Sequence, residues 1–510
     1  TQKAQFGSEP VNNTIFGAYL TYKTEVPKFT KWINKLPNID TDAPSFFSIR
    51  SEIAYLLPGT PSGIDLEGAA TSYIDDFEGA QIPLDIKSPK QWFTASTPQG
   101  QIGDLDFNNG NLAPGLPNEL RTGAKRSRLS WYNIDPIFYG TSLRPSNIDS
   151  QELSRAEVRQ VNFSELFPEV DLDITQTSIV RTFDLAYYPQ ERGPYNYDDG
   201  FDAGGKYPNP EDRWGGITRA LTTTDFQQAN IEYMQFWLMD PYENYSMQPE
   251  EGAPVIPPND NDFKGELYFN FGSISEDILK DDRKMFENGL PEDGVQIPGS
   301  NVEITPWSSI PKNQSLLYAF TESDEARTNQ DLGLDGINDT DEATKFGALF
   351  GSDPSADNFQ YFRGSNLDAE DASILSRYKD FSLTEGNSPT VNNSVESFPT
   401  SSTSFPDVED INKDQTMSAI ESYYQYKVSL NKQDLIVGQN FIVDKRVTTI
   451  NLPNNTTQTS TWYQFRIPIT KPEDPNNIIN DISDFTSIRF MRIFLTKFSI
   501  PVVLRFGELE

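Results

Sequence analysis

Apolar and polar residues alternate with a period of two in several stretches of this chain, and no other feature constrains the fold as strongly. The alternation runs through 47–57, 266–271, 424–430 and 463–469. Because successive side chains of a strand point to opposite faces, the pattern predicts strands with one buried face. The run 231–239 is apolar on both faces, as in a central strand. Since 36 prolines and 32 glycines interrupt the chain too often for a helical bundle, we predict a mainly-β protein built from jelly-roll-like β-sandwich units.

The chain contains no histidine and no cysteine. Imidazole is the usual general base and transition-metal ligand, and thiolate is the usual soft ligand and strong nucleophile. Zinc hydrolases, Ser-His-Asp hydrolases, Cys-His proteases and disulfide scaffolds are therefore excluded. The remaining chemistry is that of carboxylates, hydroxyls, Lys, Arg, Tyr and backbone, and we expect a binding, structural or conduit protein without enzymatic activity or an organic cofactor.

The charge balance is strongly acidic, with 41 Lys and Arg against 75 Asp and Glu and a net charge of -34. A nucleic-acid partner is disfavoured because its phosphates would be repelled, whereas divalent cations would be attracted. No apolar run approaches the ~18 residues of a membrane-spanning helix. The alternating strands of a membrane β-barrel give a weaker signal and stay compatible with the sequence.

Three stretches rich in turn-forming residues, at 189–213, 249–262 and 385–405, divide the strand pattern. We expect four parts: an N-terminal strand region that can form barrel wall (1–62), a first β-sandwich unit (63–275), an acidic, loop-rich insertion with a linker (276–404), and a second β unit ending in barrel strands (405–510). The stretch 385–405 is expected to be a mobile linker, because its Ser, Thr, Asn and Pro residues supply little for a core. The N-terminus has no signal-peptide pattern, and we expect both ends to be cut from a longer precursor.

The sharpest ligand spacing lies in the string 331–342. Counted from Asp331, it places Asp335 at position 5, a glycine at 6, Asp339 at 9 and Glu342 at 12. This is the spacing of a calcium loop, in which oxygen ligands surround the ion and the glycine permits a sharp turn. Position 3 is Gly333, which supplies no side-chain ligand. Calcium binding by an isolated loop and an acidic turn without an ion are both compatible with this string.

A weaker version of the same spacing begins at Asp410 and continues through Asn412 and Asp414 to Glu421. Gln415 stands where the glycine is needed, and a strand pattern follows from Tyr424. A capped turn that runs into a strand is the alternative to a second calcium site.

Three further groups of residues have a functional and a structural interpretation. Five tryptophans with the many tyrosines suit sugar stacking or a buried core: Trp92, Trp131, Trp214, Trp237 and Trp462. The carboxylates Asp75, Asp76 and Glu78 suit a glycosidase, which needs two carboxyl groups across a sugar, or else a turn, cap or ion site. The basic island Lys125–Arg128 suits a solvated strand face or an ion-pair partner of the acidic insertion.

Several short strings, taken in order, resemble the SprA/Sov family, the outer-membrane translocon of the type IX secretion system in Bacteroidota. The strings are 73–79 (YIDDFEG), 129–136 (LSWYNIDP), 192–198 (RGPYNYD), 213–219 (RWGGITR), 235–241 (QFWLMDP) and 269–277 (FNFGSISED). The calcium-loop string 331–342 also falls where similar sequence is expected. The resemblance extends from about residue 40 to the C-terminus and so covers nearly all of the chain.

The resemblance implies a very large outer-membrane β-barrel that conducts folded cargo proteins to the cell surface and supports gliding motility. It implies a PorV-type barrel protein, a periplasmic plug subunit and secreted cargo as partners, with domains facing the lumen, periplasm or cell surface. This chain would be an internal piece, mostly β-sandwich, with barrel-wall strands near 45–57 and 487–506. A cell-surface glycan-binding protein or adhesin is the alternative, and a carboxylate-dependent glycosidase is a second one.

Overall fold

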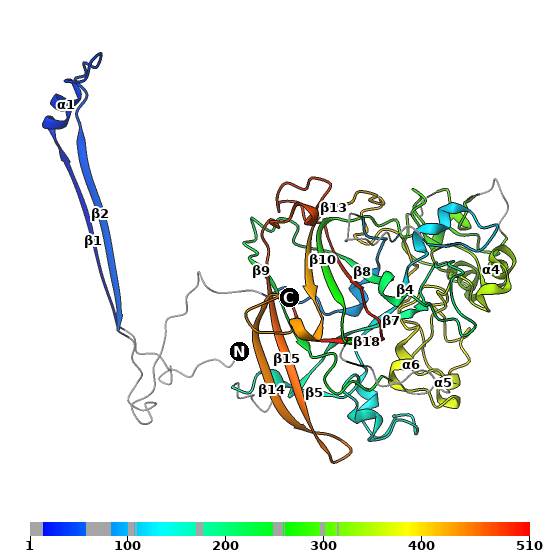
Figure 1. The fold of residues 1–510 in the computed structure, drawn as a ribbon. Coiled ribbons are helices and arrows are strands. Elements are labelled where there is room, and N and C mark those ends of the chain that lie inside the picture. The colour runs from blue at the N-terminus through cyan, green and yellow to red at the C-terminus, as the bar shows by residue number, and fades with distance from the viewer. Residues whose placement is uncertain are drawn as a thin grey trace. The chain divides into compact units, whose positions relative to one another are not determined.

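The computed structural model describes residues 14–57, 83–99, 107, 110–169, 177–247, 259, 261–295, 301–313 and 316–510. The chain forms two compact units, Thr1–Pro83 and Leu84–Glu510 (Figure 1). The string 73–79, with Asp75, Asp76 and Glu78, lies outside the described residues. In the part of the chain that the structure describes, no helix is long and apolar enough to cross a membrane.

The N-terminal unit contains a long antiparallel hairpin. Strands β1 (Thr14–Glu25) and β2 (Phe46–Leu57) pair along their full length, and the short helix α1 (Pro27–Ile33) lies in the connection between them. The period-two stretch at 47–57 therefore forms the strand that its pattern predicts. Nearly all of the side chains on both strands are exposed within this unit.

The two faces of this hairpin differ in chemistry. Directly opposed residues of an antiparallel pair point to the same face. One face carries the pairs Phe16–Tyr55, Ala18–Ile53 and Tyr22–Ile49, whereas the other carries Tyr19–Glu52, Thr21–Arg50 and Lys23–Ser48. The hairpin is therefore amphipathic, and its apolar face is open, with Ile53 68% exposed.

Among the residues described in the second unit, the framework is two six-stranded antiparallel sheets. The first sheet has the order β16 (Ile478–Ile479), β13 (Ser422–Ser429), β10 (Glu266–Ser273), β17 (Phe490–Thr496), β8 (Trp214–Ala220) and β3 (Phe93–Thr94). The second has the order β14 (Ile442–Asn451), β15 (Thr457–Pro468), β9 (Tyr233–Met239), β18 (Val502–Leu509), β7 (Phe183–Arg192) and β4 (Ser127–Tyr132). The predicted mainly-β class is confirmed.

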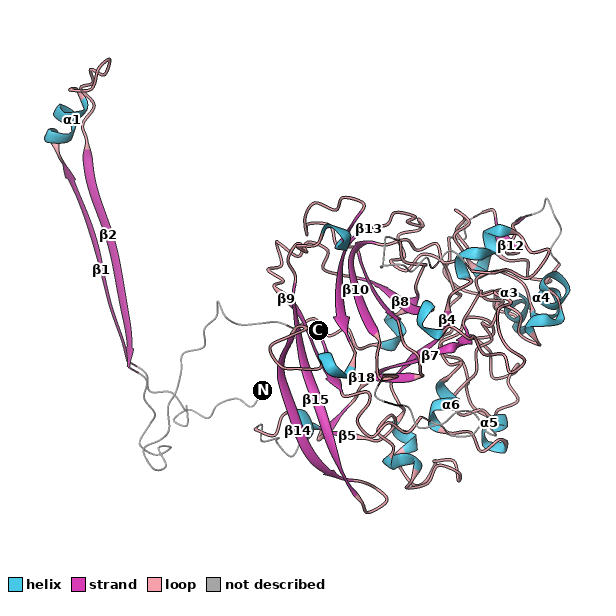
Figure 2. Ribbon diagram, viewed as in Figure 1, coloured by secondary structure: helices cyan, strands magenta, loops and turns pink. Residues whose placement is uncertain are grey.

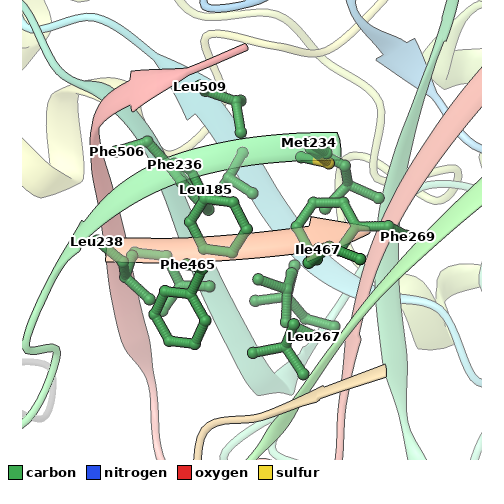
Figure 3. Packing of buried hydrophobic residues seen from close by; sticks show 14 of the residues in the cluster. Leu185, Met234, Phe236, Leu238, Leu267, Phe269, Phe465, Ile467, Phe506 and Leu509 are labelled. Carbon is green, nitrogen blue, oxygen red and sulfur yellow. The ribbon is translucent and has the colours of Figure 1, made fainter. Parts of the chain in front are cut away.

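The main hydrophobic core lies between these two sheets and takes side chains from both (Figure 3). Phe236 on β9 stacks on Phe465 of the neighbouring strand, with ring centroids 4.8 Å apart. It also meets Phe269 of the other sheet at 5.4 Å. Leu267, Phe269 and Phe271 are buried as the alternation predicts. The two sheets therefore form a sandwich whose inner faces interdigitate.

In each sheet, strands from the first part of the second unit pair with strands from its last part. β17 pairs with β10 on one side and β8 on the other, and β18 pairs with β9 and β7. The expected first unit (63–275) and second unit (405–510) thus build one sandwich instead of two. The reason is that each range supplies only some of the strands that either sheet needs.

The expectation of barrel-wall strands near 487–506 is also wrong. β17 is buried along its whole length, and all but one residue of β18 are buried. Central strands of a sandwich are covered on one face by the core and on the other by loops, so their apolar residues meet protein on both sides. These strands belong to the sandwich core.

The remaining elements are short, and several of those in the insertion, such as α3 and α4, lie beside the sandwich (Figure 2). Outside the insertion they are β5 (Val161–Asn162), α2 (Phe163–Leu166), β6 (Ile179–Val180) and the 3₁₀ turns η1 (Pro89–Gln91), η2 (Asn118–Gly123), η3 (Pro136–Phe138), η4 (Glu152–Ser154), η5 (Pro210–Asp212), η8 (Lys432–Asp434) and η9 (Pro475–Asn477). The insertion 276–404 carries η6 (Glu287–Gly289), β11 (Val302–Ile304), β12 (Ser309–Pro311), α3 (Asp324–Gln330), α4 (Asp339–Phe346), η7 (Ala348–Phe350), α5 (Ser365–Ala369) and α6 (Ile374–Tyr378).

Specific contacts attach the insertion to the sandwich. Tyr378 of α6 stacks on Tyr132 of β4, with centroids 4.4 Å apart. The stretch 385–405, expected to be a linker, is also anchored, because Ser388 is buried and its N–H donates to Asp331 Oδ2 (2.8 Å). Polar side chains and turns bind this stretch to the insertion in place of an apolar core.

We predict that Phe236→Ala lowers the free energy of unfolding by about 3–5 kcal/mol, because it removes a ring that contacts both sheets and leaves a cavity. The matched control is Val447→Ala on β14, where the side chain is 59% exposed and a change within about 0.5 kcal/mol is expected. Urea denaturation followed by tryptophan fluorescence measures both. Equal losses in the two variants would contradict the packing described here.

Candidate metal centre

Five carboxylates of the insertion converge into what we call the carboxylate cage: Asp339, Glu342, Asp353, Asp357 and Glu385. They form two groups of three, Asp339–Glu342–Glu385 and Glu342–Asp353–Asp357, that share Glu342. Within each group, one oxygen from every residue lies within 4.8 Å of the others. The cage is therefore assembled from three separate stretches of the insertion.

The first stretch is the start of α4. Asn338 caps this helix, because its Oδ1 accepts from the N–H groups of Thr340 and Asp341, both at 3.1 Å. Asp339 and Glu342 follow at a spacing of three residues, which brings them to one side of the first turn. The helix start thus presents two carboxylates together.

The second stretch is the turn that contains Asp353 and Asp357. Asp353 Oδ1 accepts from the N–H of Asp357 (3.1 Å), which closes the turn. The N–H of Ser355 donates to Glu342 Oε2 (2.8 Å), so the turn is bonded directly to α4. Asn358 Nδ2 donates to both carboxylate oxygens of Asp339, at 3.1 and 3.0 Å.

The third stretch contains Glu385, and a main-chain hydrogen bond places it beside the turn. A glycine lets the calcium-loop string approach the same turn. The N–H of Glu385 donates to the carbonyl of Asp357 (2.9 Å) and sets Glu385 beside the turn. Gly333 has φ of +72°, and a Cβ there would lie 2.3 Å from Asp357 Oδ2. Only glycine allows the calcium-loop string and this carboxylate to approach so closely.

Several oxygens of the cage have no hydrogen-bond partner among the residues that the structure describes. These are both oxygens of Asp357, Oε1 of Glu342 and Oε2 of Glu385. Asp357 and Glu342 are both 0% exposed. The hydroxyl of Tyr195 lies near Asp357, but its hydrogen-bond partners are Thr384 Oγ1 (3.0 Å) and the N–H of Leu334 (2.8 Å). A buried carboxylate without a partner is costly, so this arrangement calls for a compensating charge.

The electrostatics reflect this crowding. Burial, and then the charge of Asp335, raises the pKa of Glu342 to about 8. Burial, followed by the charges of Asp335, Glu342 and Asp353, raises the pKa of Asp357 well above its usual range. Burial, with the charge of Asp357 next in size, raises the pKa of Glu385 to about 12. Each carboxylate therefore disfavours ionisation of its neighbours unless a cation joins them.

The string 192–198 supports the cage from β7 and the turn that follows. Arg192 donates to the backbone carbonyls of Phe350, Pro354 and Asp353, and so holds the turn that carries Asp353. Tyr197 is hydrogen-bonded to Ser355 Oγ (2.7 Å) and stacks on Phe346 of α4, with centroids 4.1 Å apart. One of the strings that carry the family resemblance thus packs directly behind the cage.

The comparisons with known proteins connect this region to a family. Residues 336–510, which include all five carboxylates of the cage and the last strands of the sandwich, match the family model SprA_N, described as a motility related/secretion protein. Over this stretch the chain is similar to the SprA_N family. The resemblance to the SprA/Sov family is thereby confirmed. The search of curated proteins found no match.

Three of the four predicted ligands of the first calcium string lie close together. Asp339 and Glu342 are cage residues, and Asp335 is buried beside them, with its Oδ2 accepting from Ser355 Oγ (2.7 Å). Asp331 points elsewhere and contacts Ser388, in a group with Glu287 and Asp407. The turn at Gly333 separates it from the cage.

Sequence analysis missed Asp353, Asp357 and Glu385. The spacing of Asp353 and Asp357 in the string 353–358 (DPSADN) is a turn signal that was available. Glu385 carried no such signal, because its position depends on a main-chain contact with a turn 28 residues earlier, at Asp357.

Three predicted ligands of the second calcium string, Asp410, Asn412 and Asp414, lie in one turn, where Asn412 Nδ2 donates to Asp414 Oδ2 (3.0 Å), but Glu421 lies elsewhere. Asp410 Oδ2 pairs with Lys284 Nζ (2.6 Å), and Asp414 binds its own turn through the N–H of Thr416 (2.9 Å). Glu421 is bonded instead to Arg492 of β17 at 3.0 and 3.1 Å, in a buried ion pair. The capped turn described above as the alternative is what forms around Asp410.

The other candidate groups also have structural roles. All five tryptophans named above are buried, so their rings are not open to an external sugar. In the basic island, Arg126 is buried and donates to the carbonyls of Pro194 and Ala95, whereas Arg128 pairs with Asp380 at 2.5 Å. The ion pair with the acidic insertion is the interpretation that the structure supports.

We predict that Glu421→Ala lowers the free energy of unfolding by about 3–5 kcal/mol, because it leaves Arg492 buried without its counter-charge. The control is Glu303→Ala, which breaks the half-exposed pair with Arg283 (3.2 Å) and is expected to change stability by less than about 1 kcal/mol. Chemical denaturation of both variants tests this difference. A loss in Glu421→Ala no larger than in the control would contradict it.

Proposed function

We propose that this chain is a segment of an outer-membrane protein-conducting translocon that exports folded proteins to the cell surface in type IX secretion and supports gliding motility. The observation that carries the proposal is the match of residues 336–510 to a family of motility related/secretion proteins. The ordered strings of the SprA/Sov family extend the resemblance across the rest of the sandwich. In this role the chain works as a conduit part without catalysis.

The N-terminal hairpin suits the wall of such a pore. Its strands are 12 residues long, and a membrane-spanning strand needs about 9–11 residues. The face with Phe16, Ile53 and Tyr22 suits lipid, and the face with Arg50 and Lys23 suits a polar lumen. The sandwich of the second unit would then be the lumenal, periplasmic or surface domain attached to the wall.

The proposed partners are a PorV-type outer-membrane barrel protein, a periplasmic plug subunit and secreted cargo. An affinity pull-down of the full-length parent protein from detergent-solubilised outer membranes, read by mass spectrometry, tests them. Recovery of a second barrel protein, a plug subunit and cargo supports the translocon. Recovery of the parent protein alone, or with polysaccharide, contradicts it and favours the adhesin alternative.

We predict that Ile53→Arg, made in the full-length parent, lowers both its level in the outer membrane and cargo export. An arginine on a lipid-facing strand position costs about 2–4 kcal/mol near the bilayer midplane. Glu52→Arg is the matched control, because it is the adjacent residue on the polar face opposite Tyr19. Membrane fractionation and secreted-cargo assays measure both variants, and equal behaviour of the two would reject the assignment of faces.

A further inference from the structure

We propose that the carboxylate cage binds calcium, with Asp339, Glu342, Asp353, Asp357 and Glu385 as its ligands and Glu342 shared between its two halves. This ligand set differs from the calcium loop that the spacing of 331–342 predicts. The inference rests on the geometry of the insertion and does not depend on the translocon role.

The first argument is the absence of a protein counter-charge. No arginine or lysine side chain that the structure describes lies within 4.0 Å of a carboxylate oxygen of these five residues. The charges of Arg128 and Arg192 act on Asp353 from a greater distance. Arg128 is paired with Asp380, and Arg192 donates to backbone carbonyls. Other buried carboxylates of the same unit either pair with an arginine, as Glu421 does with Arg492, or accept backbone N–H groups with both oxygens, as Glu409 does. Both oxygens of Asp357 and Oε1 of Glu342 have neither kind of partner among the described residues.

The second argument is the burial of oxygens that have no hydrogen-bond partner. Asp357 is 0% exposed and offers two oxygens that accept no hydrogen bond from any described residue, and Glu342, equally buried, offers one. Both residues belong to a three-carboxylate group whose oxygens lie within 4.8 Å of one another. Bare carboxylates repel at such distances, whereas an ion between them converts the repulsion into attraction.

The third argument concerns the kind of ion. The ligands are oxygens only, which suits hard cations and disfavours zinc or copper. Calcium accepts six to eight oxygens at irregular angles, whereas magnesium requires near-octahedral geometry and keeps several waters. Five carboxylates from a helix start, a turn and a third stretch offer many oxygens without octahedral regularity, so calcium is the better fit.

Binding would connect three stretches of the insertion to one another and, through Ser355 and Arg192, to β7 of the sandwich. The ion would thus act as a cross-link in a region with little apolar core. Because the two groups share Glu342, the cage would supply ligands to one bridging ion or to two adjacent ions.

The test uses the 510-residue chain after treatment with a chelator. Isothermal titration with calcium chloride is expected to show uptake of one or two ions with a dissociation constant between about 1 μM and 1 mM, and weaker uptake of magnesium. Calcium in excess is expected to raise the melting temperature by roughly 5 °C, because a ligand that binds only the folded state stabilises it. No heat of binding and no shift in melting temperature at millimolar calcium would overturn the proposal.

Two variants distinguish binding from a purely structural role. Glu342→Gln keeps the acceptor for the Ser355 N–H but removes one charge, so it is expected to melt higher than the unsubstituted chain without calcium. With calcium it is expected to lose most of the upward shift. If Glu342 served only as a hydrogen-bond acceptor, the variant would show an unchanged calcium shift, and that result would overturn the assignment.

Asp341→Asn is the matched control. Asp341 lies on the same helix turn, is exposed, and contacts Asn338 instead of the cage. Its calcium shift is expected to equal that of the unsubstituted chain. A loss as large as in Glu342→Gln would show a non-specific effect of acidic charge and overturn the site. Asp357→Asn supplies a second variant from another stretch and is expected to weaken calcium uptake at least tenfold.

Discussion

The pairing of the last two strands with strands from the first half of the second unit is the interaction on which the rest of the structure depends. β17 lies between β10 and β8, and β18 lies between β9 and β7, so each sheet has a C-terminal strand near its centre. Phe506 and Leu504 of β18 are fully buried in the main core. Without these strands neither sheet is continuous. Such long-range pairing requires closure of loops of more than 200 residues before the strands contribute contacts, as between Phe269 and Ile493.

The sandwich and the insertion use different means of stabilisation. The sandwich buries rings and aliphatic side chains between its sheets, and several buried charges around it are paired, as with Arg213 and Asp198 at 2.7 Å. The insertion has short helices, two three-residue strands and a smaller core around Trp307 and Tyr197. It relies on capped turns and on carboxylates that accept its backbone N–H groups. One of these is Glu409, which follows the insertion in sequence and accepts from the N–H groups of Ile278 and Met285. The unpaired carboxylates of the cage stand out against both patterns.

Much of the fold followed from local pattern, and much of the candidate site did not. The alternation at 266–271 and 463–469 correctly predicted β10 and part of β15, and the apolar run 231–239 correctly indicated a central strand, β9. The family resemblance led to the expectation of barrel-wall strands at 487–506. It was wrong because a strand facing a second layer of protein and a strand facing lipid have similar apolar content. The calcium-loop spacing found Asp339 and Glu342 but could not supply Asp353, Asp357 and Glu385, which come from other turns.

By itself the sequence determined which stretches are strands, which chemistry is available and which family residues 336–510 resemble. These properties are local: side-chain alternation follows from backbone geometry, and the lack of histidine and cysteine leaves only oxygen ligands for a metal. Tertiary structure alone decided that two stretches 130 residues apart, 63–275 and 405–510, share one sandwich, and that three stretches of the insertion bring their carboxylates together. The physical reason is that a period of two specifies the face on which a side chain lies but not the neighbouring strand. Which strands become neighbours depends on how the whole hydrophobic core is buried. The cage forms where the turns that connect these elements come together.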